Sequence, residues 1–135
     1  MTRDEVVAGV KECIAQALDL TADEIGEDQR LVGDLGADSL DLLDLTFHLE
    51  RRFQVKISPR DMEKRGREKL GDKPWEVDGV LTADARAELQ SNMPEVPAEE
   101  FAEGLTVDRI PRLFRVATMV NLVCRLMEEK AASSG

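Results

Sequence analysis

The sequence predicts an all-α fold, and three observations lead to this prediction. Leu, Val, Ala and Met supply most of the apolar side chains, and all of these except Val are good helix formers. Aromatic residues make up only 4% of the 135 residues, and Tyr is absent. Apolar residues also recur at helical spacing in three separate segments. A chain of this length fits one domain and can bury a core without disulfide or metal crosslinks.

The first helix is expected to begin at Thr2. Thr2-Arg3-Asp4-Glu5 has the form of a capping box, in which two side chains satisfy free N–H groups at a helix start. The helix should end near Leu18. One apolar stripe runs along it and consists of Val6, Val10, Cys13, Ile14 and Ala17.

A long loop follows over residues 19–38, where the helical periodicity lapses. A structureless loop of ~20 residues is uncommon in a compact domain. We therefore expect the apolar residues scattered through this loop to anchor it to the core. These residues are Leu20, Ile25, Leu31, Val32 and Leu35.

The second helix is expected to begin at Asp38 or Ser39, with Asp38 placed to cap it, and to run to about Phe53. Side chains advance by ~100° per residue around a helix, so one face of this segment is apolar and should face the core. That face consists of Leu42, Leu45, Thr46, Leu49 and Phe53.

A second apolar set lies to one side of this core-facing stripe and is flanked by Asp41 and Asp44. We call this set, Leu40, Leu43 and Phe47, the apolar strip. An apolar strip with an acidic border suggests a contact surface. The alternative is a helix that is buried on two sides in a larger core.

The remaining elements lie in the second half of the chain. A closing helix should run from Val116 to Met127 and end at Glu128-Glu129-Lys130, before a small polar tail over residues 131–135. Residues 64–69 form a polar, basic run, and 71–74 form a turn. Short helices are expected over 82–89 and 97–103.

The charge distribution excludes one class of function. The net charge of −10 argues against nucleic-acid binding, because an acidic surface repels phosphate. Residues 1–50 carry 13 acidic and 3 basic side chains, whereas residues 51–73 carry 4 acidic and 9 basic ones. No apolar run approaches the ~20 residues of a membrane span, and no apolar leader is present, so we expect a cytoplasmic protein.

An enzyme or a metal site is not expected. Cys13 and Cys124 lie far apart in the sequence and have no CxxC or Cys/His partner, so they predict buried thiols. The single histidine, His48, has no nucleophile at catalytic spacing on its helix and should be an exposed surface residue.

The segment Gly36-Ala37-Asp38-Ser39-Leu40-Asp41 is the candidate functional motif. It places the Ser39 hydroxyl at a predicted helix N-terminus, where free N–H groups and the helix dipole favour a phosphate. Asp and Ser are also the commonest helix caps, so a purely structural role fits the same residues.

The motif, with Leu35 before it, resembles the attachment site of acyl carrier proteins, and the similarity covers roughly residues 4–62 and, more loosely, 105–129. The resemblance implies a four-helix carrier-protein bundle with a long loop between helices one and two. It implies that Ser39, preceded by Asp38, carries covalent 4′-phosphopantetheine, which holds acyl groups as thioesters. The docking surface that it implies consists of Leu40, Asp41, Asp44, Phe47 and Glu50.

The resemblance also implies the partners and leaves two alternatives. Partners would be a phosphopantetheinyl transferase and acyl-transfer or synthase enzymes with basic docking patches, and the carrier would be a monomer. The first alternative is a small acidic interaction module without a prosthetic group. The second is a peptidyl or aminoacyl carrier, although the acid before Ser39 and the Leu-Asp after it favour fatty-acid and polyketide carriers.

Two features depart from the family pattern. Arg51 and Arg52 stand where such proteins usually continue with acids; these bases either pair internally with the acidic first third or select dedicated partners.

About 40 additional residues, approximately 63–104, form a partly helical insertion in a single domain over 1–130. Either 57–62 or 96–101 resembles the start of helix three. The insertion's apolar residues either shelter an acyl chain or pack the insertion: Trp75, Val77, Val80, Leu81, Leu89, Met93 and Phe101.

Overall fold

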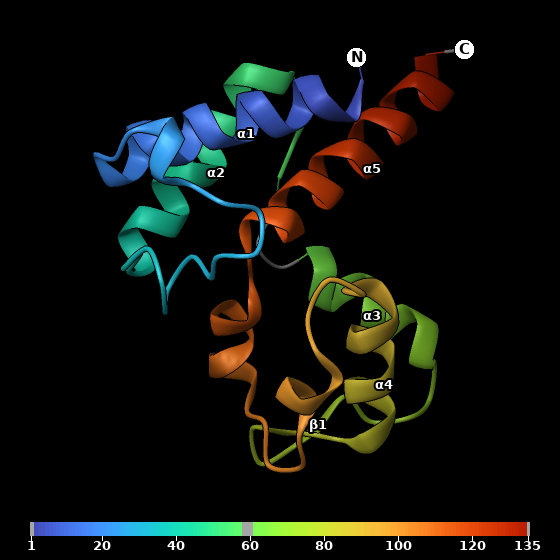
Figure 1. Cartoon of the computed structure of the whole chain (residues 1–135). Helices are drawn as coiled ribbons and strands as arrows, with labels where there is room; N and C mark the ends of the chain where they lie inside the picture. The colour runs from blue at the N-terminus through green and yellow to red at the C-terminus, as the bar shows by residue number, and fades with distance from the viewer. Residues whose placement is uncertain (1, 58–60, 135) are drawn as a thin grey trace. The chain divides into compact units, whose positions relative to one another are not determined.

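The computed structural model describes residues 2–57 and 61–134, and its helices are drawn in Figure 1. The chain divides into two compact units. The first unit combines Met1–Ile57 with Phe114–Gly135, and the second unit is Ser58–Leu113. The structure is mainly helical, which confirms the predicted all-α class. Within the described ranges, no helix is both long and apolar enough to cross a membrane.

The first unit contains the three helices whose apolar stripes were predicted: α1 (Arg3–Leu18), α2 (Ser39–Phe53) and α5 (Val116–Ser134). A short 3₁₀ helix, η1 (Ala22–Glu24), follows α1. The predicted cap of α1 is confirmed, because the Glu5 N–H donates to Thr2 Oγ1 at 3.2 Å. Helix α5 continues past its predicted end at Lys130, since the alanines that follow favour helix.

The core of the first unit is formed by the apolar stripes of these helices. A close approach between α1 and α2 occurs at Gly9, where an added Cβ would lie 2.6 Å from Phe53 Cζ. A larger residue at this position would therefore displace the aromatic ring. The most deeply buried side chains of α1, α2 and α5 are Val6, Val10, Ile14, Leu45, Leu49, Phe53, Val116, Val120 and Val123.

The loop between α1 and α2 is anchored to this core, as predicted. Ile25 and Leu31 are buried, and Leu35 packs against the core. The backbone adds a second set of attachments: the Leu31 N–H donates to the Phe114 carbonyl at 3.1 Å, and the Val116 N–H donates to the Gln29 carbonyl at 3.0 Å. Leu20 and Val32 are only half-buried. These attachments therefore fix the position of the loop and, with it, the start of α2.

The second unit contains α3 (Asp61–Leu70), β1 (Glu76–Val77), β2 (Val80–Leu81), α4 (Ala83–Asn92), η2 (Ala98–Phe101) and η3 (Val107–Leu113). Residues 58–60, which belong to one of the two segments that resemble the start of helix three, lie outside the described residues. The predicted short helices over 82–89 and 97–103 correspond to α4 and η2. The basic run over 64–69 lies in α3.

An antiparallel hairpin pairs β1 with β2 and was not predicted. Its two turn residues, Asp78 and Gly79, both have positive φ, at 52° and 83°. Two residues of this kind form the tight turn that suits the twist of paired strands.

The apolar residues of the second unit are mostly buried. Trp75 lies against α3 at Gly66, where an added Cβ would be 2.5 Å from the indole ring. Of the residues considered for sheltering an acyl chain, Val77 and Val80 are exposed. The others are buried: Trp75, Leu81, Leu89, Met93 and Phe101. Their burial gives them a packing role that requires no acyl chain.

Candidate functional site

Ser39 is the first residue of α2, and its neighbours make the helix cap. The Asp41 N–H donates to Asp38 Oδ1 at 2.8 Å, and the Asp38 N–H donates to Asp41 Oδ2 at 3.0 Å. The predicted capping role of Asp38 is confirmed. The reciprocal role of Asp41 was missed, although an acid three residues after a capping acid is the signal of a capping box. Ser39 is exposed, so its hydroxyl is accessible while the cap is made by other residues.

The backbone around Ser39 offers hydrogen-bond donors to an anion. The first intrahelical bond runs from the Leu42 N–H to the Asp38 carbonyl at 3.0 Å, so the N–H groups of Ser39 and Leu40 precede the helical ladder. The positive end of the helix dipole lies at the same place. Gly36 has a φ of +75° and no atom within 4 Å of where its Cβ would stand, so the approach is open. A phosphate on the Ser39 hydroxyl fits this environment.

The apolar strip is exposed. The exposed fractions are 75% for Leu40, 45% for Leu43 and 50% for Phe47. Burial of this helix on two sides is therefore wrong for these three positions. Three large apolar side chains on one helix face, in solvent, form a surface that suits a transient protein contact. The docking role itself remains a prediction.

The acidic residues predicted for docking each have a local contact. Asp44 Oδ2 lies 3.3 Å from His48 Nε2, one helical turn away. His48 is half-buried and lies beside Asp44, so the expectation that it is exposed is wrong. Glu50 Oε2 accepts from the Ile57 N–H at 3.2 Å, which attaches the chain after α2 to the helix. Asp44 and Glu50 therefore each have a contact within the chain that the sequence did not indicate.

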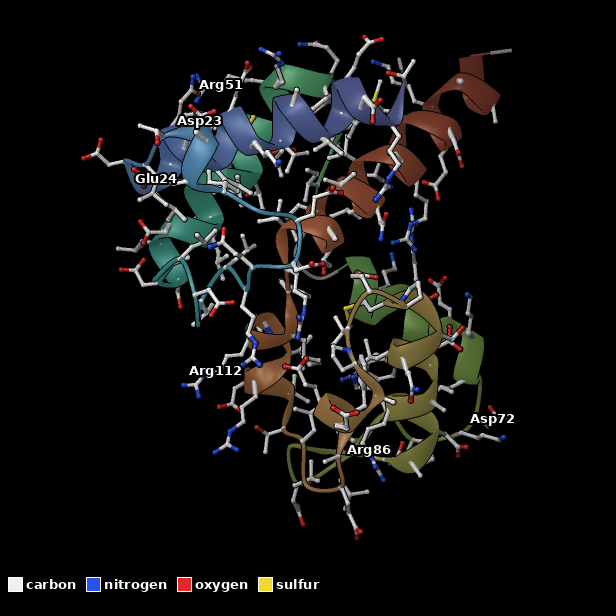
Figure 2. All side chains as sticks on the ribbon, viewed as in Figure 1. Asp23, Glu24, Arg51, Asp72, Arg86 and Arg112 are labelled. Atoms are coloured by element: carbon white, nitrogen blue, oxygen red, sulfur yellow. The ribbon has the colours of Figure 1, made fainter. Side chains whose placement is uncertain are left out.

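The two arginines at the end of α2 differ from each other. Arg52 Nη2 lies 3.0 Å from Glu12 Oε2 of α1, so this base does pair with the acidic first third of the chain. Arg51 is exposed, and its side chain extends away from the ribbon in Figure 2. The part of the chain that the structure describes provides no ion-pair or hydrogen-bond partner for the Arg51 guanidinium.

The cysteine thiols differ in accessibility. Burial raises the pKa of the Cys13 thiol, whereas Cys124 is half-buried. Because the thiolate is the reactive form, we expect a disulfide reagent at pH 8 to label Cys124 before Cys13 in protein that lacks any prosthetic group. A Cys124→Ser variant should then contain one slowly reacting thiol; rapid labelling of that variant would contradict the buried position of Cys13.

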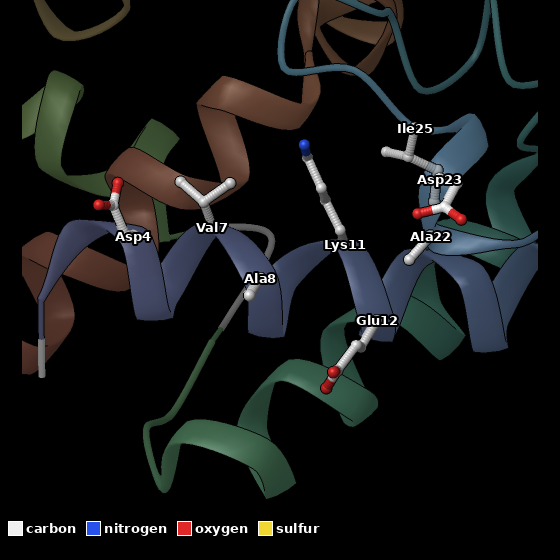
Figure 3. Close-up of a pocket in the computed structure, with 8 residues that line it drawn as sticks. All are labelled: Asp4, Val7, Ala8, Lys11, Glu12, Ala22, Asp23 and Ile25. Atoms are coloured by element: carbon white, nitrogen blue, oxygen red, sulfur yellow. The ribbon is translucent and has the colours of Figure 1, made fainter.

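A surface depression of about 410 Å³ lies against α1 and η1, as Figure 3 shows. Lys11 and Asp23 contribute charged groups to its lining, beside the apolar Val7 and Ile25. Neither Ser39 nor any residue of α2 belongs to the lining. Over the described residues, no cluster of His, Cys, Asp and Glu could hold a metal ion.

Comparisons with known proteins identify one family whose sequences match the segment around Ser39. A family described as "Phosphopantetheine attachment site" matches residues 8–66. The acyl carrier protein of Thermotoga maritima is 41% identical over 63 residues, which span 47% of this chain and 78% of that protein. The acyl carrier protein of Petrotoga mobilis is 44% identical over 64 residues, or 47% and 75% of the two chains. The acyl carrier protein of Borreliella burgdorferi is 46% identical over 57 residues, or 42% and 71%. No solved structure matches.

Proposed function

Because the chain belongs to the acyl carrier protein family, whose members carry covalent 4′-phosphopantetheine and are not enzymes, we propose that it holds acyl groups as thioesters on an arm attached to Ser39. The observation that carries the proposal is the exposed Ser39 at the first position of α2, with the helix cap supplied by Asp38 and Asp41. The cap does not use the serine hydroxyl, which is therefore available for attachment of the arm.

The proposed role of the polypeptide is attachment and docking. The Ser39 oxygen forms the new bond to phosphorus, and loses its proton, when a phosphopantetheinyl transferase acts with coenzyme A and magnesium. The phosphoanhydride bond of coenzyme A breaks in the same step, and adenosine 3′,5′-bisphosphate is the leaving group. The N–H groups of Ser39 and Leu40 and the helix dipole favour the resulting phosphodiester. When bound, the prosthetic group supplies the terminal thiol that carries the acyl group.

The proposed partners are the transferase and acyl-transfer or synthase enzymes with basic docking patches. The apolar strip would fix the register of docking, and Asp41 and Asp44 would steer bases towards it. A docking contact made by three apolar side chains and two acids is small, and small interfaces favour the rapid release that a carrier needs. We further propose that the carrier is a cytoplasmic monomer.

We also propose that residues 1–130 are one carrier domain and that the second unit, Ser58–Leu113, contains its insertion. The family match ends at residue 66, so most of this unit is additional to the shared part. An addition of this size supports a specialised fatty-acid, lipid or polyketide pathway. Ordinary elongation of acyl chains on this carrier by general fatty-acid enzymes would count against that specialisation.

The thioester can be tested directly. A broad-specificity phosphopantetheinyl transferase and an acyl-coenzyme A should give a chain whose intact mass rises by one acyl-phosphopantetheine group. Neutral hydroxylamine should then remove the acyl group and leave the phosphopantetheine, because it cleaves thioesters and spares phosphodiesters. An unmodified chain would favour the interaction module without a prosthetic group.

A further inference from the structure

The exposed face of α2 does not end at Phe47. Residues three and four positions apart lie on one side of a helix, so Arg51 continues the line of Leu40, Leu43 and Phe47. Both Phe47 and Arg51 are exposed. The face therefore begins with apolar side chains beside Asp41 and Asp44, and it ends with a cation in the last turn of the helix.

Arg51 differs from Asp41 and Asp44, the acidic residues of this face, in its contacts within the chain. Asp41 bonds to the Asp38 backbone, and Asp44 lies beside His48. For the guanidinium of Arg51, the described residues supply no partner, whereas its neighbour Arg52 is paired with Glu12. An unengaged guanidinium on a contact face is available to a carboxylate of another molecule, which it can bind through two parallel hydrogen bonds.

We propose that Arg51 is a specificity-determining residue of the docking face, and this inference rests on the proposed carrier function. The partner that fits presents an apolar depression for Leu40 and Phe47, a base opposite Asp44, and a carboxylate opposite Arg51. An enzyme whose docking patch is basic along its whole length meets repulsion at Arg51. The residue therefore favours dedicated partners and disfavours general ones.

The position of Arg51 also suits a purely structural role, because a cation in the last turn complements the helix dipole. The two roles give different results. A structural cation should affect stability and act equally on all partners. A specificity-determining cation should change the choice between two partners that differ at a single charge.

The probe is a condensing enzyme from bacterial fatty-acid synthesis with a basic docking patch, assayed with the loaded full-length carrier. Arg51→Glu should lower the KM of this enzyme for the carrier by about fivefold, the scale of an exposed charge pair. The effect should fade in 0.5 M NaCl because salt screens exposed charges. The matched control is Lys56→Glu, an equal change in charge at an exposed cation outside α2, which should leave the KM within about twofold.

A variant of the condensing enzyme supplies the second arm. Replacing the base that faces the end of α2 with glutamate should reverse the preference, so that this enzyme favours wild-type carrier over Arg51→Glu. The KM for the Arg51→Gln carrier should lie between the values for the wild type and for Arg51→Glu, because glutamine removes the positive charge without adding a negative one. Equal effects of Arg51→Glu and Lys56→Glu, no effect of either, or no reversal with the altered enzyme would overturn the inference.

Loading is measured first by intact mass, so the two possible failures are distinguishable. If the carrier does not accept phosphopantetheine, the proposed function fails, and the inference about Arg51 fails with it. If all variants load fully and the preference does not follow position 51, only the inference fails. Circular dichroism of each variant confirms that α2 is retained.

Discussion

Ser39→Ala is expected to abolish addition of phosphopantetheine completely, because the substitution removes the oxygen that forms the bond to phosphorus. The cap of α2 should survive, since its two hydrogen bonds come from Asp38 and Asp41. Alanine is also well tolerated in the first turn of a helix. The variant should therefore fold and unfold like the wild type, with a change in the free energy of unfolding of about 0.5 kcal/mol or less. Intact-mass measurement after incubation with the transferase shows the loss.

The matched control for this experiment is Ser91→Ala. Ser91 is an exposed serine of α4, so the change removes an equivalent hydroxyl elsewhere. This variant should accept one phosphopantetheine group, as the wild type does. Modification of Ser39→Ala, or loss of modification in Ser91→Ala, would show that the attachment site has been assigned to the wrong residue.

Phe53→Ala is expected to destabilise the first unit by about 3–5 kcal/mol, because it removes a large buried side chain and leaves a cavity. Phe53 is only 3% exposed and packs where α1 and α2 approach at Gly9. A loss of this size is a large share of the ~5–15 kcal/mol that stabilises a typical domain. Urea denaturation followed by far-ultraviolet circular dichroism measures it.

Phe47→Ala provides the control, because it makes the same chemical change on the same helix. Phe47 is 50% exposed, so its replacement should change the free energy of unfolding by about 1 kcal/mol or less. Similar destabilisation of the two variants would mean that Phe47 belongs to the core, and the exposed apolar strip would then lose one of its three members.

The sequence was sufficient to predict the helices of the first unit because their signals are local. The stripes of α1, α2 and α5 follow the helical period, and the cap residues Thr2 and Asp38 stand directly before their helices. The anchoring of the loop through Leu31 was also predictable, since an apolar residue in a long loop seeks the core. The helical stripes and caps depend on neighbours within a few positions, whereas the anchoring of Leu31 uses the distant Phe114 as well.

The second unit was harder to predict because its elements are short and polar. Helix α3 consists mainly of charged residues, and Met62 and Leu70 are its only large apolar ones, so few apolar positions mark it as a helix. The hairpin around Asp78-Gly79 carries a recognisable turn signal, but each strand is only two residues long. Elements of this size depend on packing around residues such as Trp75, which no local pattern reveals.

Details of the candidate site also depended on three-dimensional contacts. The sequence places Arg51 and Arg52 side by side, and both are exposed. Only the position of Glu12 on α1 separates the paired Arg52 from Arg51, which has no partner among the described residues. Glu50 was predicted to dock partners, and its bond to the Ile57 backbone depends on the path of the chain after α2. The position of Ser39 at the first turn of α2 was predictable, because Asp38 marks the cap.

The most direct test of the account is to locate the prosthetic group in the wild-type chain. The loaded protein is digested, and fragmentation of the peptide that contains Gly36–Leu40 identifies the modified residue. The account predicts one phosphopantetheine group, and predicts it on Ser39. A group on any other residue, or a wild-type chain that remains unmodified by an active transferase, would contradict it.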